Sequence, residues 1–511
     1  MVIITDKNIS HLKILILMVG CFISIYSLYF FIINKVYLIG SDVYYYMAIA
    51  ESLLNSGVMK DIVTIPSGPI KTPQNGIVFI HIILSLFGIG AKEHILAIVV
   101  LNYLLYLSGV YPIYKIARIL GLDKGLPIIS LLSVYLGAWH IYRINLLAIN
   151  DGVFNSLTLW LVYLIIEFVR IEDTFESFSF QKIILKELSI IYFLVIVLIL
   201  FRLNALFLIG STVISLIIVK KFRASVYFIA GSIFLIIATF SIFILFEVWH
   251  LKTSVIGHLL NMFLAINVYN LKLQLWKILP RLIIGVGGLT NPIFTLIFTI
   301  FPLSTMYYCT RGIMEKNFIK VYLSILCLTG LWFTMHFQNA RLIWYTFPFF
   351  YLIILSLKRI RYVGLVFVFL VYVLSFKQFY NGFSRVPESK LFLYMYENNI
   401  SLPVNNPLLL TSEARHAYFL LSTRSYRVSD ASDGTLDGKI TFPKQLNWNL
   451  IEKRGALFVL GDSTYINSAY SQVEEMAESN DYKLKVEPMT PDLDEFEGWG
   501  LVELALYKVE Y

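Results

Sequence analysis

The chain has 511 residues, of which 58% are hydrophobic and only 14% are charged, and its mean hydropathy is +0.74. Ordinary globular proteins contain about 25% charged residues, so this composition excludes a soluble protein and indicates a polytopic membrane protein. The net charge of +8 could suggest a nucleic-acid partner. Lysine and arginine, however, cluster in short loops between apolar runs, so the charge reports membrane orientation and we expect no nucleic-acid binding.

Long apolar runs predict transmembrane helices rather than barrel strands, because a helix needs about 20 apolar residues to cross the bilayer core. The first run spans residues 14–33 and follows basic residues. It is too long for a signal peptide and lacks a small-residue cleavage site, so we expect a retained helix with a cytoplasmic start. Counting the runs predicts about eleven transmembrane helices. The three cysteines lie within apolar runs and are expected only to pack there: Cys21, Cys309 and Cys327.

Basic residues recur in every second loop, which predicts that these loops face the cytoplasm. The clusters are Lys115 with Arg118 and Lys124, Arg170, Lys220 with Lys221 and Arg223, Arg311 with Lys316 and Lys320, and Lys358 with Arg359 and Arg361. The intervening loops carry Asp42, Asp151 and Arg202, and we place them on the outer face. The apolar segment 76–90 is too short to span the bilayer, so we expect an interfacial helix in the first outer loop.

Asp42 is the first candidate site residue. It follows the first apolar run, in the stretch GSDVYYY at 40–46. A carboxylate at the boundary between lipid and water is costly unless it is used. There it could accept the proton of a hydroxyl that attacks an anomeric carbon. Ser41 and Asp42 are also preferred N-cap residues, so a purely structural role at the start of the next helix is the alternative.

A second acidic residue and two arginines are predicted on the same face. Asp151 lies in the stretch NDG at 150–152 and could act in the site, support it, or only start the next helix. Arg202 and Arg341 lie at the ends of apolar runs. A guanidinium suits the negative charge of a lipid phosphate, although arginines at such positions also extend to lipid head groups without binding a ligand. Arg341 is the preferred phosphate contact.

Other polar residues on this face are weaker candidates for substrate contact. Lys71 could face a phosphate or simply be solvated. Tyr44 and Tyr45 could stack on a sugar or belong to the aromatic belt of the membrane interface. His258 lies in the segment 250–277, which could close over a lipid carrier. Histidines could hold a divalent metal together with the two aspartates, but no His-x-x-x-His spacing is present, so we assign no metal and no other cofactor.

After the last apolar run, at 362–376, the composition becomes that of a soluble protein. We therefore expect two domains, a transmembrane domain at 1–380 and an extracytoplasmic domain at 381–511. Short apolar runs at 407–411, 456–460 and 501–509 predict strands, and 468–478 predicts a helix, which together indicate a small α/β domain. This part of the chain offers no convincing site of its own.

Five stretches appear in an order that is familiar from one superfamily. They are GSDVYYYMAIA at 40–50, TPQNG at 72–76 with LFG at 86–88, NDGVF at 150–154, FRLN at 201–204 and RLIWYTFP at 341–348. In these stretches the chain resembles the GT-C superfamily of integral membrane glycosyltransferases, near the protein mannosyltransferase and aminoarabinose transferase branch. It departs from that branch because TPQ replaces paired prolines and Leu203 follows Arg202 where a proline is frequent.

The resemblance implies a polytopic helical fold and transfer of a sugar, with inversion, from a polyprenyl-phosphate carrier to an acceptor. The acceptor would be a glycolipid, a polysaccharide or a protein at the outer face of the cytoplasmic membrane, with membrane lipid around the site. Asp42 and Asp151 would be the catalytic carboxylates, and Tyr345 in the last stretch joins the candidates for substrate contact. A flippase or transporter of lipid-linked saccharides and a polysaccharide polymerase or ligase are the alternatives. A flippase or transporter would need charged residues across the bilayer. A polymerase or ligase would need arginine-rich outer loops.

Overall fold

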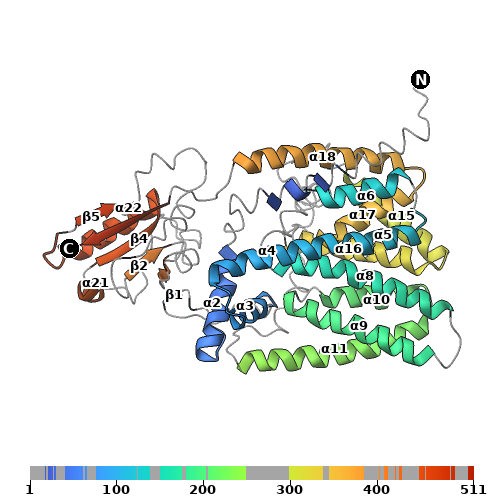
Figure 1. Ribbon diagram of the computed structural model, residues 1–511, viewed down its shortest axis with the longest axis horizontal. Helices are drawn as coiled ribbons and strands as arrows, with labels where there is room; N and C mark the ends of the chain where they lie inside the picture. The colour runs from blue at the N-terminus through green and yellow to red at the C-terminus, as the bar shows by residue number, and fades with distance from the viewer. Residues whose placement is uncertain are drawn as a thin grey trace, which may run out of the picture.

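The structure of the full chain is a computed structural model (Figure 1). It describes most of the helical region and part of the C-terminal region. The described residues are parts of 18–29, then 41–60, 62, 64–65, 76–122, 125–138, 150–174, 180–202, 205–248, 298–337, 344–384, 402, 408–411, 421, 425–427, 448–454, 456–483, 485–488 and 504–510.

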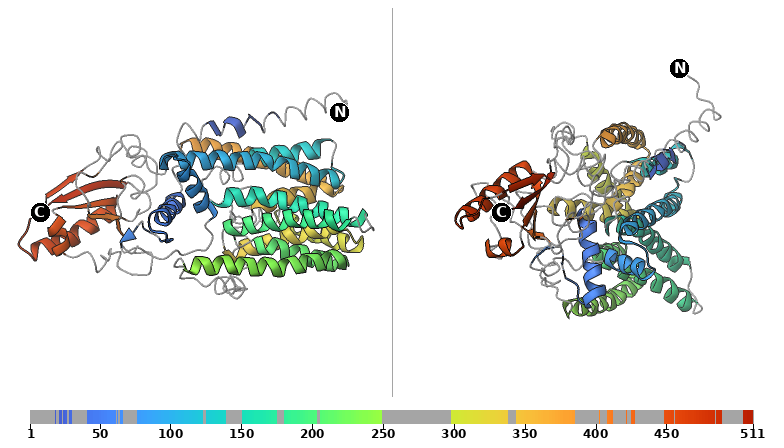
Figure 2. Two further views of the ribbon diagram at one scale, coloured as in Figure 1. Left: turned by 60° about the horizontal axis from the view of Figure 1, so that its bottom comes forward. Right: turned by 60° about the vertical axis from the view of Figure 1, so that its left-hand side comes forward.

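Thirteen helices that the structure describes between residues 41 and 384 form a bundle (Figures 1 and 2). They are α2 (Ser41–Ser56), α3 (Gly76–Leu86), α4 (Ala91–Ser108), α5 (Val110–Ile119), α6 (Leu126–Gly137), α8 (Asn150–Thr174), α9 (Phe180–Phe201), α10 (Ala205–Ile218), α11 (Phe222–Val248), α15 (Ile300–Met314), α16 (Phe318–Phe337), α17 (Phe347–Ser356) and α18 (Arg361–Ser384).

Two described helical stretches are long and apolar enough to cross a membrane, Glu93–Ile119 and Asn150–Ile171. The first combines α4 and α5, because Gly109 between them keeps helical dihedral angles of −61° and −19°. Several other helices are apolar but shorter. The predicted helix in the first outer loop is confirmed as α3, which is too short to span a bilayer. The total of about eleven transmembrane helices stays a prediction.

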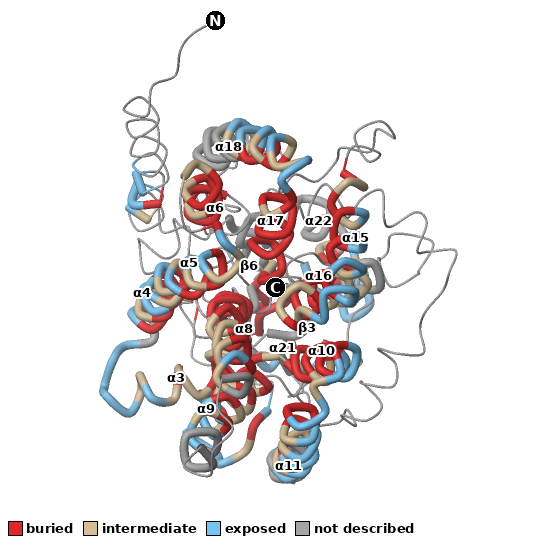
Figure 3. The backbone as a smooth tube through the Cα atoms, turned by 90° about the vertical axis from the view of Figure 1, so that its right-hand side faces the viewer, coloured by how far each residue is buried: buried red, intermediate tan, exposed pale blue. Residues whose placement is uncertain are grey.

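The core of the bundle lies around α17, whose residues from Phe347 to Leu355 are all buried. α17 contacts α6, α15, α16 and α18. Exposed large apolar side chains lie instead on outer helices, such as Phe234 on α11 and Phe369 on α18. Figure 3 shows exposed residues along the outer sides of α11 and α18. In water such a surface would be unfavourable, so it indicates contact with lipid.

One end of the bundle is defined by contacts between distant segments. The backbone N–H of Ile77, in α3, donates to Asn150 at the start of α8, over 3.1 Å. Gly76 packs against Phe201, the last residue of α9. α2 packs against α3, and the backbone N–H of Tyr345, just before α17, donates to α8 close to its start. We call this end, which faces the sheet in Figures 1 and 2, the sheet end.

The basic turns lie at the opposite end of the bundle. Arg170 is near the end of α8, and a helix rises 1.5 Å per residue, so it lies on the order of 30 Å from the sheet end. α10 begins beside Arg202 and leads away to the turn at 219–221. α16 and α17 are joined at the sheet end, so the turns at 315–317 and 357–360 lie at the far end. These basic turns therefore lie at the end of the bundle opposite to Asp151 and Arg202, and the side of the membrane that each end faces stays a prediction.

The C-terminal region contributes five strands of a six-stranded sheet, with α21 (Trp448–Arg454) and α22 (Ser463–Glu478) beside it. The strand order is β1-β3-β2-β4-β6-β5, parallel from β1 to β4 and antiparallel at β6 and β5. The strands are β1 (Thr64–Ile65), β2 (Leu408–Thr411), β3 (Ser425–Arg427), β4 (Ala456–Asp462), β5 (Lys485–Pro488) and β6 (Leu504–Glu510). The three strands and the helix predicted here correspond to β2, β4, β6 and α22. The domain boundary near residue 380 stays a prediction.

The edge strand β1 comes from the opposite part of the chain. It lies between α2 and α3 and pairs in parallel with β3, with Thr64 opposite Ser425 and Ile65 opposite Tyr426. The connection from α2 to α3 and the start of α3 are therefore held at two points, by this pairing and by the bond from Ile77 to Asn150. This connection is not predictable from the sequence, because two residues carry no alternating pattern.

Replacing Thr64 and Ser425 with cysteine is expected to give a disulfide on mild oxidation. Paired residues on neighbouring strands have Cα atoms about 5 Å apart, which is within the range that a disulfide spans. The linkage is read by mass spectrometry of non-reduced peptides. A matched control places cysteines at Thr64 and at Lys485, in the strand at the other edge of the sheet, and should not link. Equal linkage in both variants would contradict the pairing.

Candidate functional site

The sheet end of the bundle contains a buried ion pair between two residues that the sequence singled out separately. Asp151 is the second residue of α8, and Arg202 directly follows α9. Because α8 and α9 pack side by side and run in opposite directions, the start of one meets the end of the other. The guanidinium Nη2 of Arg202 contacts Oδ1 of Asp151, and the two side chains are 17% and 1% exposed.

Two local effects stabilise the carboxylate of Asp151. It lies in the first turn of α8, where the helix dipole and the free backbone N–H groups favour a negative charge. The paired guanidinium provides the opposite charge that a buried carboxylate needs. Arg202 is thus held inside the protein, so the alternative in which it extends freely to lipid head groups does not describe it. Because of this pairing, the role of Asp151 is not limited to the start of α8.

Asn150, the neighbour of Asp151, joins α8 to the first outer loop. Its Oδ1 accepts the backbone N–H of Ile77 at 3.1 Å, and its Nδ2 donates to the Tyr46 hydroxyl at 3.1 Å. Beside it, a Cβ atom at Gly76 would lie 2.8 Å from the ring of Phe201, so only glycine allows α3 to approach α9 this closely. These contacts bring the ends of α2, α3, α8 and α9 together around the ion pair.

Position 42 lies near this junction by helix geometry. Asp42 is the second residue of α2, and Tyr46 follows one turn later on the same face of that helix. Tyr46 accepts a hydrogen bond from Asn150, the residue before Asp151. The face of α2 that includes position 42 therefore faces the start of α8. The side chain of Asp42 itself lies outside the described residues, so its catalytic role stays a prediction.

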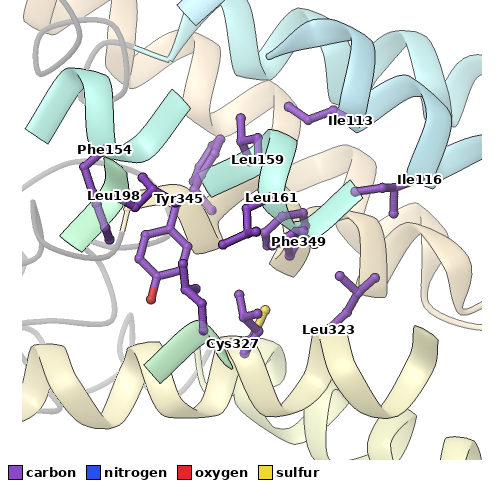
Figure 4. Packing of buried hydrophobic residues seen from close by; sticks show 14 of the residues in the cluster. Ile113, Ile116, Phe154, Leu159, Leu161, Leu198, Leu323, Cys327, Tyr345 and Phe349 are labelled. Carbon is purple, nitrogen blue, oxygen red and sulfur yellow. The ribbon is translucent and has the colours of Figure 1, made fainter. Parts of the chain in front are cut away.

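The segment before α17 is fixed to the same region. Asn155 lies one turn after Asp151 on α8, and its Oδ1 accepts the backbone N–H of Tyr345 at 3.2 Å. The Tyr345 ring is buried and meets Phe154 edge-on, with ring centroids 5.8 Å apart, while Cys327 of α16 lies on its other side (Figure 4). Tyr345 thus packs within the bundle, and its contact with substrate stays a prediction.

The remaining sequence candidates divide into two groups. Tyr44 and Tyr45 are buried in α2, with 1% and 7% of their surface exposed, so they belong to the core and not to an exposed aromatic belt. Whether either contacts a sugar stays a prediction. The other three candidates lie outside the described residues: Lys71, His258 and Arg341.

Two buried histidines join α3 to α4 next to this junction. The Nδ1 atoms of His81 and His94 lie 3.4 Å apart, and Nε2 of His94 lies 3.0 Å from the carbonyl oxygen of Ile89. A carbonyl can only accept, so Nε2 of His94 carries a hydrogen, and Nδ1 of a neutral His94 accepts from His81. Burial lowers the pKa of His81 to about 3, and His94 acts in the same direction. This contact is therefore one between neutral rings.

Among the residues that the structure describes, no group of three or more His, Cys, Asp or Glu side chains is arranged to hold a metal ion. A cation would have to compete with Arg202 for the carboxylate of Asp151, because the guanidinium already supplies the positive charge beside it. The chemistry available here is that of a buried carboxylate and a guanidinium whose charges balance each other.

No protein-family model matches the sequence, and no curated protein matches it significantly. Solved structures do match the fold. The archaeal oligosaccharyltransferase AglB from Archaeoglobus fulgidus, in complex with an inhibitory peptide and a dolichol-phosphate, aligns with a TM-score of 0.52 and 12% identity over 92% of this chain and 71% of that chain. The same enzyme tethered to an acceptor peptide gives 0.52 and 12% over 94% and 73%.

A second match is ArnT from Cupriavidus metallidurans bound to undecaprenyl phosphate, with a TM-score of 0.46 and 12% identity over 99% of this chain and 98% of that chain. AglB, whose match has the higher TM-score, is a membrane glycosyltransferase of the GT-C superfamily. The chain therefore has the fold of the GT-C membrane glycosyltransferases, as the resemblance of its sequence predicts.

Proposed function

We propose that the protein is an inverting membrane glycosyltransferase that moves a sugar from a polyprenyl-phosphate carrier to an acceptor. The observation that carries the proposal is the buried pair of Asp151 and Arg202, at the end of the bundle where the first outer loop, α8, α9 and the start of α17 meet. The fold supports it, because AglB, which has the same fold, is an oligosaccharyltransferase solved with a dolichol-phosphate.

In the proposed reaction the acceptor oxygen attacks the anomeric carbon as the bond from that carbon to the phosphate oxygen breaks. The acceptor proton passes to Asp42, and the carrier leaves as polyprenyl phosphate. Phosphate is already a good leaving group, so a second carboxylic acid is not needed, unlike in glycosidases. One displacement without a covalent intermediate inverts the anomeric configuration.

The arginines stabilise the charge that develops on the leaving phosphate. Arg341 is proposed as the direct contact. The Arg202 side chain is 17% exposed and its guanidinium is held by Asp151, so we propose that Asp151 acts mainly as a positioning residue. The acceptor class is a glycolipid, a polysaccharide or a protein.

The proposed orientation follows from charge. The basic turns at the far end of the bundle favour the cytoplasm under the positive-inside rule. The sheet end, with the site and the C-terminal α/β region, would then lie on the outer face of the cytoplasmic membrane.

The proposal is tested with the full chain in nanodiscs and a panel of polyprenyl-phosphate sugars labelled in the sugar. We expect at least one donor to be consumed, with label appearing in a membrane-extract acceptor and polyprenyl phosphate released in equal amount. Arg311→Gln, at the opposite end, serves as a control variant that keeps its activity. Movement of an intact donor across vesicles without consumption would overturn the proposal in favour of a flippase.

A further inference from the structure

One buried polar atom near the ion pair has no partner among the described residues. Asn155 is only 5% exposed. Its Oδ1 accepts the backbone N–H of Tyr345, but its Nδ2 makes no hydrogen bond. Buried amide groups are almost always hydrogen-bonded, because leaving a donor without an acceptor costs its full desolvation. The amide therefore requires an explanation.

The position of Asn155 suggests what the missing acceptor is. Residues four apart share one face of a helix, so Asn155 lies on the face of α8 that also carries Asp151. It is about 6 Å further into the bundle along the helix axis. Its neighbours Phe154 and Tyr345 pack ring against ring and supply apolar contacts. Asn155 is thus a lone donor in an apolar wall, one helical turn from the carboxylate that Arg202 contacts.

We propose that Nδ2 of Asn155 donates a hydrogen bond to a phosphate oxygen of the lipid-linked donor. This inference rests on the proposed function. A hydrogen bond to an anionic oxygen is shorter and stronger than one to a neutral hydroxyl. The guanidinium of Arg202 contacts Asp151, one turn earlier on α8, and so lies at the same end of the bundle. The acceptor would then be the group that Arg202 faces, and the phosphate would bind between α8 and α9.

The Oδ1 atom of Asn155 has a separate role from its Nδ2 atom. By holding the backbone N–H of Tyr345, it also fixes the chain just before α17. One side chain would thus bind the phosphate and also hold α8 to the start of α17. Asp151, by contrast, acts through Arg202 alone.

Two variants separate these roles. Asn155→Asp keeps an acceptor for the Tyr345 N–H and removes the donor, whereas Asn155→Leu removes both without adding charge. We expect the dissociation constant for polyprenyl phosphate without a sugar, in nanodiscs, to rise about 10-fold or more in each. The control is Thr158→Val, whose hydroxyl donates within the helix to the carbonyl oxygen of Phe154 at 2.8 Å, and which should bind like the wild type.

Thermal unfolding without ligand checks that Asn155→Asp is folded, since the anchor to Tyr345 is kept. If wild type transfers sugar but both Asn155 variants bind polyprenyl phosphate as wild type does, the inference is wrong and the proposed function stands. The inference is also wrong if only the sugar-bearing donor loses affinity, because the contact is then to the sugar. If wild type neither binds polyprenyl phosphate nor consumes any donor, the proposed function itself fails.

Discussion

Replacing Asp42 with asparagine is expected to lower the rate of sugar transfer by about 10²- to 10⁴-fold, because an amide cannot accept the proton of the attacking hydroxyl. Donor binding should stay close to that of the wild type, since the proton is transferred only during the reaction. The measurement is the turnover number with saturating donor and acceptor, together with the dissociation constant for the donor.

This substitution also separates the catalytic role from the structural alternative. Asparagine caps a helix as well as aspartate does, so Asp42→Asn preserves any capping at the start of α2. The loss of one charge near the helix N-terminus costs only about 0.3–1 kcal/mol. A large loss of rate with unchanged thermal stability would therefore assign the proton transfer to Asp42.

Glu51→Gln is the matched control, because this carboxylate is on the same helix and is exposed. It should leave the rate unchanged. Full activity of Asp42→Asn would show that another group accepts the proton, and Asp151→Asn would then be the next variant to assay.

The sequence predicts most of the helical fold because each helix is encoded locally. The uncharged run at 190–200 lies within α9, and the run at 362–376 lies within α18. A helix that satisfies its own backbone needs only an apolar stretch of suitable length. The short apolar segment after Gly76 likewise becomes α3, and the runs at 407–411 and 456–460 correspond to β2 and β4.

Contacts between distant segments were not predictable in the same way. β1 is two residues long, and its partner β3 lies in the C-terminal region. The residues of these two short segments do not indicate that the strands pair with each other. Asp151 and Arg202 were each recognised from their place at the end of an apolar run. Their pairing depends on the packing of α8 against α9, which hydropathy alone does not specify.

Asn155 could have been found from the sequence. It follows Asp151 by four residues, a spacing that places two polar side chains on one face of an apolar helix. Polar residues within a membrane helix usually face the interior of the bundle, where function resides.

Breaking the buried ion pair is expected to have the largest effect on stability. Arg202→Leu alone should lower the free energy of unfolding by about 3 kcal/mol, because it leaves the buried carboxylate of Asp151 without a partner. Asp151→Leu should cost a similar amount. The double variant should cost clearly less than the sum, since two apolar side chains of similar size leave no uncompensated charge.

Denaturant unfolding in detergent micelles measures all four states of this double-mutant cycle. The exposed pair of Arg311 and Glu315 at the far end of the bundle gives a matched comparison, with side chains 50% and 37% exposed. Its removal should change the free energy of unfolding far less, because solvent screens an exposed pair. If the Asp151 and Arg202 variants were additive, the pair would not be coupled in the membrane protein. Strong coupling together with lost donor binding in Arg202→Leu would tie the stability of this junction to the binding of the phosphate.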